Sequence, residues 1–573
     1  MELEHLETRR LTGPNLLLDR AGAVTDVAVR ADDGEQDVER RVALVWEAHA
    51  TAWLDAVGWA DELVAVRRWA GGVTLAFTAE IDVLYAACEV AEAAWATAAT
   101  ALTAGGPTPP APPAEEVARL RAAIAEEADP ALLALRDAAE QADVAFLWDD
   151  DEVSLGLGRS ARTWTRVEVP RPEAVDAATQ GRVPVVLVTG TNGKSTTVRM
   201  LAHVLRHAGM SPGLTSTDGI VVGDEVVERG DFSGPGGART LLRHTGVGAA
   251  VLEVARGGLL RRGLPLERAD VSVVTNIAED HLGEYGIVDT TDLAHAKLIV
   301  SKAVRRGGLL VCNADDPLLA DLAPDDVQVG WTSQDPDSYV VRHAVDRGGR
   351  AWVVLDGVVT EVTSRRDVPV VAVADVPATL GGAARHNVAN LLSAVAAARR
   401  LEVPVDVVAS ALATFRGDSA DNPGRANRFS LDGATLVVDY AHNLAGVEAM
   451  VDTLAALPAQ RRLVMIGEAG DRPDDLIARM VGALHAGGAD HVVAVDLPSY
   501  LRGREPGEVP DLVRRTLLDL GVPPARVETA EDPLAGTRLL LEQLEPGDVA
   551  LLLVLEQREE VVTLLRARGA TEG

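Results

Sequence analysis

The stretch Val185-Val-Leu-Val-Thr-Gly190-Thr-Asn-Gly193-Lys194-Ser195-Thr196-Thr197 decides the fold of this chain. An apolar β-branched run leads into two glycines and a Lys-Ser pair, and the helical pattern VRMLAHVLRHAG follows directly. Glycines let backbone N–H groups approach phosphate oxygens, a helix N-terminus adds partial positive charge, and a lysine here can reach the β- and γ-phosphates. The segment therefore predicts a strand, a phosphate-binding loop and a helix.

The loop is a shortened variant of the common phosphate-loop pattern, because Val188 stands where that pattern has its first glycine. A glycine-rich turn without a ligand is the alternative interpretation. The strand and helix flanks favour the phosphate loop, and we expect its nucleotide contacts to come from Gly190, Thr191, Asn192, Gly193, Lys194, Ser195 and Thr196.

The alternation of apolar runs and helical patterns continues along the chain. Apolar runs such as AAVLEV, DVSVVTNI and GGLLVCNA alternate with helical patterns, which is typical of a parallel sheet covered on both faces. The alternation resumes after residue 418 with ATLVVDYA, RRLVMIGE, ADHVVAVD and DVALLLVL. The sequence thus predicts an α/β protein with a central parallel-sheet P-loop ATPase domain over residues 166–417 and a smaller Rossmann-like domain over 418–573.

The first 165 residues have a different pattern. The Pro- and Gly-rich segment 101–114 predicts a semi-rigid linker. Residues 42–60, 79–100 and 115–142 have apolar positions at helical spacing. We expect an N-terminal α+β domain over residues 1–165 that is mainly helical, with a few short strands.

Composition excludes several classes of function. The formal net charge is −32 and no Lys/Arg cluster stands out, so nucleic acid and anionic membrane are poor partners. The N-terminus is acidic, and no run of eighteen apolar residues occurs, which speaks against a signal peptide and a membrane span. Cys88 and Cys312 lie far apart in apolar contexts and suggest neither a disulfide framework nor a thiolate metal site. We expect a cytoplasmic protein.

Lysine is rare in this chain. Only Lys194, Lys297 and Lys302 occur among 54 basic residues. Where arginine serves nearly every generic positive charge, a surviving lysine indicates chemistry that a guanidinium cannot perform. We therefore treat Lys297 as a candidate site residue, although a lone helix lysine is usually solvated.

Six motifs in order carry a family resemblance. The phosphate loop is followed by LEVARGGL at 252–259, TNIAEDHLG at 275–283, Lys297, NADDP at 313–317, HN at 386–387 with Asn390, and DYAHN at 439–443. Over about residues 180–573 this series resembles the Mur ligases and the folylpolyglutamate synthetases. The ARGGL and DYAHN motifs and the Arg502 to Glu508 loop are similar to those of the Mur-ligase half of cyanophycin synthetases.

The resemblance implies ATP and Mg²⁺ as cofactors. Ser195 and Glu253 would hold the Mg²⁺ that bridges the phosphates, and His281 would hold a second Mg²⁺. Oxygen ligands suit Mg²⁺ better than imidazole does, so the His281 role depends on the resemblance alone. Lys297 matches a lysine that is carbamylated in Mur ligases, which only a primary amine allows.

Other matched positions would contact ATP or the substrates. Asn313, Asn387 and Asn390 would approach adenine and Asp439 the ribose, whereas the alternative is that they are turn-forming residues after strands. A guanidinium from Arg425 or Arg428 would reach the γ-phosphate, and the sequence does not choose between them. Residues expected to face the substrates are Thr217, Asp218, Arg256, His442, Asn443, Asp471, Arg472, Arg502 and Arg504.

These parts imply a ligase. ATP would phosphorylate a substrate carboxylate, an amine would attack the acyl phosphate, and a hinge at 417–423 would close the last domain over the intermediate. The partners are then a small-molecule acid, an acidic amino acid or short peptide, and an amine. A folylpolyglutamate-type ligase and a catalytically silent nucleotide-binding scaffold are the alternatives.

The N-terminal region also resembles cyanophycin synthetases, through RLTGPN at 10–15 and VSLGLGR at 153–159. Only about twenty residues separate Arg159 from the strand at Val183, too few for an ATP-grasp domain. We therefore expect a single-site ligase, with a separate ATP-grasp or cyanophycin-synthetase-like protein for the other step. By analogy we also expect a homo-oligomer.

Overall fold

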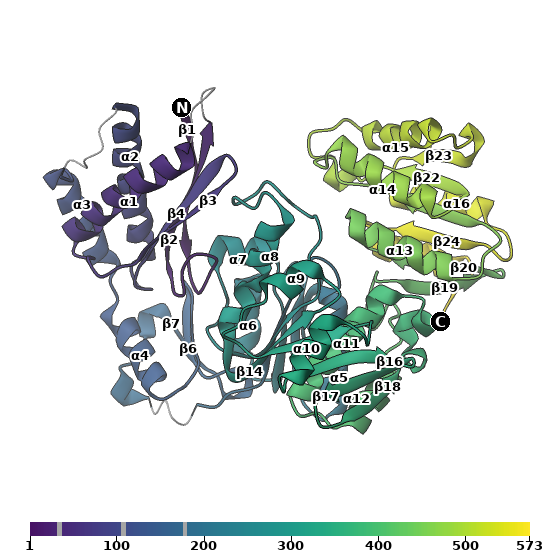
Figure 1. The fold of residues 1–573 in the computed structure, drawn as a ribbon, viewed down its shortest axis with the longest axis horizontal. Helices are drawn as coiled ribbons and strands as arrows, with labels where there is room; N and C mark the ends of the chain where they lie inside the picture. The colour runs from purple at the N-terminus through teal and green to yellow at the C-terminus, as the bar shows by residue number, and fades with distance from the viewer. Residues whose placement is uncertain (31–36, 105–110, 176–179) are drawn as a thin grey trace.

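A computed structural model describes residues 1–30, 37–104, 111–175 and 180–573. Figure 1 shows the chain as three successive parts, with the N-terminal part and the C-terminal part on opposite sides of the central one. The fold is mixed α/β, as the sequence predicts. No helix within the described ranges is long and apolar enough to cross a bilayer.

The N-terminal part contains a four-stranded antiparallel sheet in the order β1-β2-β4-β3. Helices α1 and α2 pack on it through the buried side chains of Trp46, Trp53 and Trp95. A small three-stranded sheet, β5-β6-β7, leads to the central part. The elements are β1 (Glu2–Leu11), β2 (Gly22–Arg30), α1 (Val38–Val57), β3 (Val64–Trp69), β4 (Gly72–Thr78), α2 (Leu84–Ala104), α3 (Ala114–Glu127), α4 (Pro130–Gln141), β5 (Phe146–Trp148), β6 (Glu152–Leu155) and β7 (Arg162–Thr165).

Two expectations for this region need correction. The strands are not all short, since β1 has 10 residues and β2 has 9. The sequence of β1, ELEHLETRRL, is polar on both faces because it is an edge strand, which hides the alternation that marks a half-buried strand. The predicted linker begins too early, since α2 continues to Ala104. Its residues 105–110 lie outside the described residues.

The central part is built on an 11-stranded sheet in the order β11-β10-β9-β12-β8-β13-β14-β15-β16-β17-β18. The strands from β9 to β16 in this order pair in parallel. The strands are β8 (Val185–Thr189), β9 (Pro212–Ser216), β10 (Gly219–Val222), β11 (Glu225–Arg229), β12 (Ala249–Glu253), β13 (Ala269–Val274), β14 (Val304–Asn313), β15 (Val329–Ser333), β16 (Arg350–Leu355), β17 (Val358–Thr363) and β18 (Asp367–Ala372).

Helices cover both faces of this sheet, which explains why its strands are apolar throughout. Val186 and Val188 of β8 face the core under α5, α11 and α12. Val185 and Leu187 face the opposite core, under α6 and α7. The helices are α5 (Lys194–His207), α6 (Pro235–Arg243), α7 (Arg256–Arg262), α8 (Thr290–Leu298), α9 (Pro317–Leu322), α10 (Tyr339–Asp346), α11 (Arg385–Arg400) and α12 (Val405–Leu412).

The central sheet departs from the parallel arrangement at its two edges. β10 and β11 form an antiparallel hairpin at one edge, and β17 and β18 extend the other edge antiparallel. The turn between β16 and β17 is Asp356-Gly357, with φ of 50° and 78°. An Asp-Gly pair with positive φ at both positions is a favoured two-residue hairpin turn, so the sequence contained a signal for this edge.

The C-terminal part has a seven-stranded sheet in the order β23-β22-β21-β24-β20-β19-β25. Strands β23 to β20 in this order are parallel, whereas β19 and β25 are antiparallel additions. The elements are β19 (Asn427–Leu431), β20 (Ala434–Asp439), α13 (Leu444–Ala456), β21 (Arg462–Ile466), α14 (Asp474–Ala486), β22 (His491–Val495), α15 (Glu508–Asp519), β23 (Val527–Ala530), α16 (Pro533–Gln543), β24 (Val549–Leu553), α17 (Arg558–Ala567) and β25 (Thr571–Glu572). α13, α14 and α15 cover one face, and α16 and α17 cover the other.

Polar contacts join the three parts. Lys302 donates to the carbonyl of Asn15 at 2.7 Å and pairs with Asp19 at 2.8 Å, which attaches the N-terminal part to the central one. On the other side, Arg558 of α17 pairs with Asp218 at 3.0 Å, and the Asn422 side-chain amide donates to Oγ1 of Thr196 at 3.1 Å. The central and C-terminal sheets therefore meet around the phosphate-loop helix α5.

Candidate active site

The loop after β8 is held in shape by the segment after β13. Thr191 N–H donates to the Asn276 carbonyl at 2.9 Å, and Asn192 N–H donates to Oδ1 of Asn276 at 2.9 Å. In return, Oγ1 of Thr275 donates to the Asn192 carbonyl at 2.6 Å. Because these bonds come from the segment that directly follows the neighbouring strand, the loop is held in this shape without a ligand.

Both glycines of the loop are required by the backbone and by close neighbours. Gly190 has φ of 147°, and a Cβ there would lie 1.8 Å from Oγ1 of Thr275. Gly193 has φ of 83°, and a Cβ there would lie 2.0 Å from Oδ1 of Asn390. Any side chain at either position would displace the loop.

Ser195 and Glu253 meet at the base of the loop. The Ser195 hydroxyl donates to Oε2 of Glu253 at 2.8 Å, and the Glu253 side chain is 1% exposed. Oε1 of Glu253 is buried without a hydrogen-bond partner in the part of the chain that the structure describes. An unpartnered buried carboxylate oxygen is costly, and oxygen ligands of this kind are what Mg²⁺ prefers. The pair fits the magnesium role that the sequence suggests.

Two lysine amines converge on one carbonyl oxygen. Lys297 Nζ donates to the Gly190 carbonyl at 2.8 Å, and Lys194 Nζ lies 3.2 Å from the same oxygen and 2.8 Å from the Thr191 carbonyl. Burial lowers the pKa of Lys297 well below its usual 10.5, and the nearby Lys194 lowers it further. Two lysine amines whose hydrogen-bond partners are backbone carbonyls form a site that an anion such as a phosphate would stabilise.

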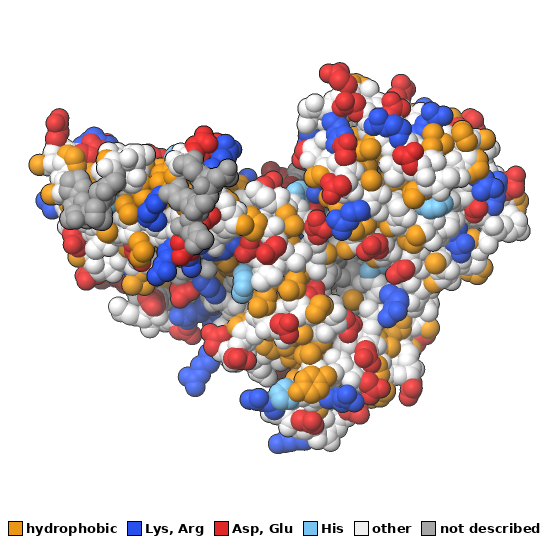
Figure 2. All heavy atoms as spheres, turned by 45° about the horizontal axis from the view of Figure 1, so that its top comes forward, with side chains coloured by type: hydrophobic (Ala, Val, Ile, Leu, Met, Phe, Trp, Pro, Cys, Tyr) orange, Lys and Arg blue, Asp and Glu red, His pale blue; other side chains and the backbone are white. Residues whose placement is uncertain are grey.

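A cavity of about 480 Å³ opens in front of these residues. The central part contributes Lys194, Ser195, Glu253 and Lys297 to its lining, and the C-terminal part contributes Arg425, Tyr440, His442, Asp471 and Arg502. Figure 2 shows a hollow above the central part, between the N-terminal and C-terminal parts. The cavity lies where the carboxyl ends of β8, β12 and β13 meet those of β20 and β21, the usual ligand position in open α/β sheets.

A second, more apolar cavity of about 280 Å³ adjoins the first and shares Asn192, Arg425 and Tyr440 with it. Its other lining residues include Asn387, Asn390, Asp439 and Met450. The Asp439 carboxylate accepts the N–H groups of Ala426 and Ala441, each at 2.7 Å, and its burial raises its pKa. The size and polarity of this cavity suit a planar base.

Asn313 is an exception among the expected adenine contacts. It does not line the second cavity, and its Oδ1 accepts the N–H of Asp315 at 3.0 Å. This is the turn-forming role that the sequence analysis gave as the alternative, and it uses the side-chain oxygen of Asn313 for a local hydrogen bond. The structure therefore does not bring Asn313 to the nucleotide cavity.

The structure separates the two candidate arginines. Arg425 lines both cavities, with its guanidinium carbon 4.6 Å from the centre of the Tyr440 ring. Arg428 lies on β19 with its side chain exposed, because side chains alternate along a strand and its neighbours Asn427 and Phe429 are buried. The structure therefore does not bring Arg428 to either cavity, which favours Arg425 as the candidate for the γ-phosphate.

The expected substrate-facing residues divide into three groups. Thr217, Arg256, His442, Asp471 and Arg502 line the main cavity, and Arg256 is paired with Glu284. Asp218 lies in a neighbouring cavity and is held by Arg199 at 3.1 Å and Arg558 at 3.0 Å.

The remaining three make structural contacts. Asn443 caps α13 by accepting the Gly446 N–H at 2.9 Å. Arg472 pairs with Asp280 at 3.3 Å. Arg504 donates to the carbonyls of Gly470 and Arg472, each at 2.7 Å, and the structure does not bring it to the main cavity.

Sequence reasoning missed several residues of this region. Asp280 and Tyr440 both line the main cavity. Asp280 directly precedes His281, and Tyr440 lies two residues before His442. Both stood inside quoted motifs, so their position was a usable signal. Glu468 follows β21 and is 2% exposed, with neither carboxylate oxygen bonded within the described residues. Burial raises its pKa to about 8, and nothing in its local sequence indicated this.

Comparison with known proteins identifies the class. The Mur ligase middle domain matches residues 188–398, and the Mur ligase glutamate ligase domain matches residues 424–553. The chain belongs to the Mur ligase family through these two domains.

The relatives include a cyanophycin synthetase of Synechocystis sp., which is 37% identical over 395 residues, covering 68% of this chain and 44% of the relative. A UDP-N-acetylmuramyl-tripeptide synthetase of Deinococcus radiodurans is 32% identical over 331 residues, covering 54% of this chain and 61% of the relative. The chain thus spans less than half the length of that cyanophycin synthetase.

Among solved structures, E. coli FolC in complex with ADP superposes with a TM-score of 0.50. It is 20% identical, and the match covers 67% of this chain and 90% of FolC. At this identity the likeness supports the fold, which agrees with the mixed α/β architecture described above.

Proposed function

We propose that this chain is an ATP-dependent ligase that joins a carboxylic acid to an amine through an acyl phosphate. The observation that carries the proposal is the convergence of Lys194, Lys297 and the Ser195–Glu253 pair on one cavity that the C-terminal part closes with Arg425. Family membership supports the same chemistry, because the relatives named above are synthetases.

The nucleotide would lie across both cavities. Its triphosphate would lie against the N-terminus of α5, with Lys194 turning from the loop carbonyls to the phosphates, and its base would enter the cavity lined by Asn387, Asn390 and Met450. Ser195 and Glu253 would hold Mg²⁺, which when bound neutralises charge on the phosphate oxygens. Arg425 would add positive charge to the γ-phosphoryl group from the opposite side.

The two steps conserve all atoms. A substrate carboxylate oxygen forms a bond to the γ-phosphorus as the bond to the β-phosphate oxygen breaks, which gives an acyl phosphate and ADP. The amine nitrogen then bonds to the acyl carbon, inorganic phosphate leaves, and the nitrogen loses a proton. The chain's contribution is positioning and electrostatics, since phosphoryl transfer requires little else from a protein.

The substrates are proposed by class. Arg256, Arg502 and His442 would provide positive and hydrogen-bonding groups for an acid, and Asp471 and Glu284 would provide carboxylates for an amine. The substrates would then replace the Arg256–Glu284 and Arg502–Asp471 ion pairs of this structure. One named relative is, by its name, a tripeptide synthetase. We therefore propose an acidic amino acid or a short peptide as the acid. A separate ATP-grasp or cyanophycin-synthetase-like protein remains our proposal for any second step.

The test is product formation. Purified full-length protein is incubated with ATP, Mg²⁺, the twenty amino acids and β-aspartyl dipeptides, and products are identified by mass spectrometry while phosphate release is followed. Lys194→Ala is the inactive control. Lys302→Ala is the matched lysine control, because the hydrogen bonds of Lys302 within the described residues go to Asn15 and Leu18 of the N-terminal part. ATP binding without any product or phosphate release across the panel would favour the scaffold alternative.

A further inference from the structure

The loop 281–287, which follows β13, carries residues of the main cavity on an unusual backbone. His281 and Glu284 line that cavity, and Glu284 is paired there with Arg256. For a residue with a Cβ, a positive φ is costly and persists only where surrounding contacts enforce it. Contacts with the rest of the molecule must therefore hold this loop in shape. Its residues with positive φ are His281 (50°), Gly283 (94°), Tyr285 (54°) and Gly286 (68°).

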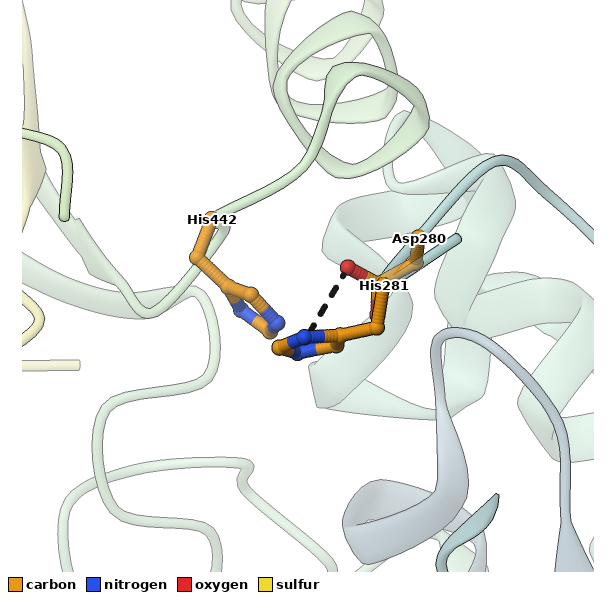
Figure 3. A group of neighbouring side chains, drawn as sticks. All are labelled: Asp280, His281 and His442. Carbon is orange, nitrogen blue, oxygen red and sulfur yellow. Dashed lines mark ion pairs between the residues drawn. The ribbon is translucent and has the colours of Figure 1, made fainter. Parts of the chain in front are cut away.

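One end of the loop lies at the C-terminal part. Figure 3 shows the His281 ring side by side with the ring of His442, which follows β20, and the Asp280 carboxylate next to both. His281 Nε2 lies 3.8 Å from Oδ1 of Asp280. The loop therefore starts where the central and C-terminal parts meet.

The other end of the loop is bonded to the N-terminal part. Arg67 of the edge strand β3 donates to the Gly286 carbonyl at 2.9 Å and pairs with Asp292 of α8 at 2.5 Å. The Asp292 carboxylate also accepts the N–H of Val288 at 3.0 Å, directly after the loop. The side chains of Arg67 and Asp292 are 17% and 21% exposed, so solvent screens their ion pair less than it screens a surface pair. One guanidinium thus fixes both the loop and the helix that follows it.

Two further side chains of the N-terminal sheet pack on the loop. A Cβ at Gly286 would lie 2.6 Å from the Trp69 indole ring, so only glycine fits between the loop and β3. The guanidinium carbon of Arg9, on β1, lies 4.9 Å from the centre of the Tyr285 ring, which is within the range of a cation–π contact. Arg9 is itself paired with Asp26 at 2.5 Å. The N-terminal sheet therefore contacts the loop at two of its residues with positive φ.

Hydrogen bonds inside the loop connect these contacts to Glu284. The N–H of Gly283 donates to the Ile287 carbonyl at 2.8 Å, and the N–H of Ile287 donates to the Glu284 carbonyl at 3.1 Å. The Ile287 side chain is buried between α7 and α8. Residues 283–287 thus form one closed turn, and a displacement at Gly286 would displace Glu284 as well.

We propose that the N-terminal part is a component of the active site, because Arg67 and Trp69 are positioning residues that hold Glu284 in the wall of the main cavity. Glu284 is one of the two carboxylates proposed above for the amine, so a displaced loop would weaken amine binding. The effect on turnover rests on the proposed ligase function, whereas the hold on the loop does not. The phosphate loop would keep its shape, since its contacts come from residues 275–278, before this loop.

Hydrogen exchange of the full-length protein tests the hold on the loop. Mass spectrometry follows exchange in the peptide that contains the Gly283 and Ile287 amides, with the phosphate-loop peptide as the internal reference. Arg67→Ala should speed exchange in the first peptide about tenfold or more and leave the second unchanged, because a charged hydrogen bond and an ion pair are lost. Arg68→Ala is the matched control, since Arg68 is the next residue of β3 and is exposed. We expect this control to exchange as the parent does.

A kinetic measurement tests the role in the active site. The amine is the one that the product assay identifies among the twenty amino acids. Arg67→Ala should raise the KM for that amine about tenfold and leave the KM for ATP within about twofold of the parent. Arg67→Lys should recover part of the loss, because it keeps the charge but lacks the fork of the guanidinium. Arg68→Ala should match the parent in both values.

The two measurements distinguish failure of this inference from failure of the ligase proposal. Unfolding midpoints establish that each variant is folded, and Arg67→Lys takes the place of Arg67→Ala if the latter does not fold. Parent-like exchange of the loop in the folded variant overturns the inference. Faster exchange with an unchanged KM for the amine overturns the positioning role. If the parent forms no product, the ligase proposal fails, and the exchange result still decides whether the N-terminal part holds the loop.

Discussion

The side-chain amides of Asn192 and Asn443 exchange two hydrogen bonds of 3.1 Å, each donating to the other's oxygen. Asn192 belongs to the phosphate loop, and Asn443 caps the first helix after β20. The loop that would hold a triphosphate is thereby bonded directly to the C-terminal part. Nucleotide binding and the position of that part should therefore depend on each other.

The first prediction concerns this amide pair. Asn443→Ala removes the helix cap and both bonds to Asn192, whereas Asn443→Asp keeps the cap and loses only the donated bond. We expect Ala to lower the free energy of unfolding by about 1 kcal/mol through the lost cap, with a smaller loss for Asp. Both variants should bind ATP more weakly in calorimetry. Parent-like ATP affinity for Asn443→Ala would show that the pair is not coupled to the nucleotide.

The second prediction separates Arg425 from Arg428. Arg425→Ala should lower the rate of phosphate release on the order of 100-fold or more, because a guanidinium at the transferring phosphoryl group stabilises transition-state charge. Arg428→Ala should leave the rate within about twofold of the parent, since its side chain is exposed on β19. Steady-state phosphate release measures both. Equal effects of the two substitutions would contradict the assignment.

The third prediction concerns carbamylation of Lys297. Burial lowers the pKa of this amine well below its usual 10.5, which increases the fraction of the neutral form that reacts with carbon dioxide. Protein in ¹³C-bicarbonate should show a carbamate resonance that Lys297→Arg lacks and Lys302→Arg retains. The Lys297→Arg variant should also lose most of its turnover. A carbamate signal that persists in Lys297→Arg would place the modification elsewhere.

The fourth prediction is a pH dependence from Glu468. Burial raises the pKa of this carboxyl from its usual 4.5 to about 8, with nearby Arg472 opposing the rise. Between these values the unfolded chain releases the proton and the folded chain keeps it, so Glu468 contributes less stability as the pH rises. Glu468→Gln should therefore raise the free energy of unfolding by a few kcal/mol near pH 8 and change it little near pH 4. Unfolding curves at both pH values measure this, and an equal effect at both would contradict it.

Much of the architecture follows from local patterns. The apolar runs at β8, β12, β13 and β14 are buried on both faces, so their sequence has no alternation to be confused with a half-exposed strand. The loop from Gly190 to Ser195 has its own chemistry and was recognisable without the rest of the fold. These strands and this loop are where the sequence-based expectation and the structure agree.

The predictions and the structure differ at residues whose position is set by contacts with distant parts of the chain. Arg425 and Arg428 are three residues apart, and only the start of β19 makes one face the cavity and the other face solvent. Asn313 resembles a ligand residue by its position after β14, yet a local turn occupies its amide. Burial of Glu468 depends on how the C-terminal part packs, which a single sequence does not encode in a local signal.

The scarcity of lysine gives this protein a property that experiments can use. Its three ε-amines occupy the phosphate loop, the floor of the same cavity and the contact with the segment between β1 and β2. Amine-directed labelling reagents would therefore modify few other positions. After digestion with a protease that does not cleave at lysine, the mass of each peptide would identify which amine had reacted. Protection of Lys194 by nucleotide and of Lys302 by the N-terminal contact could then be followed separately in one sample, without introducing any probe by mutation.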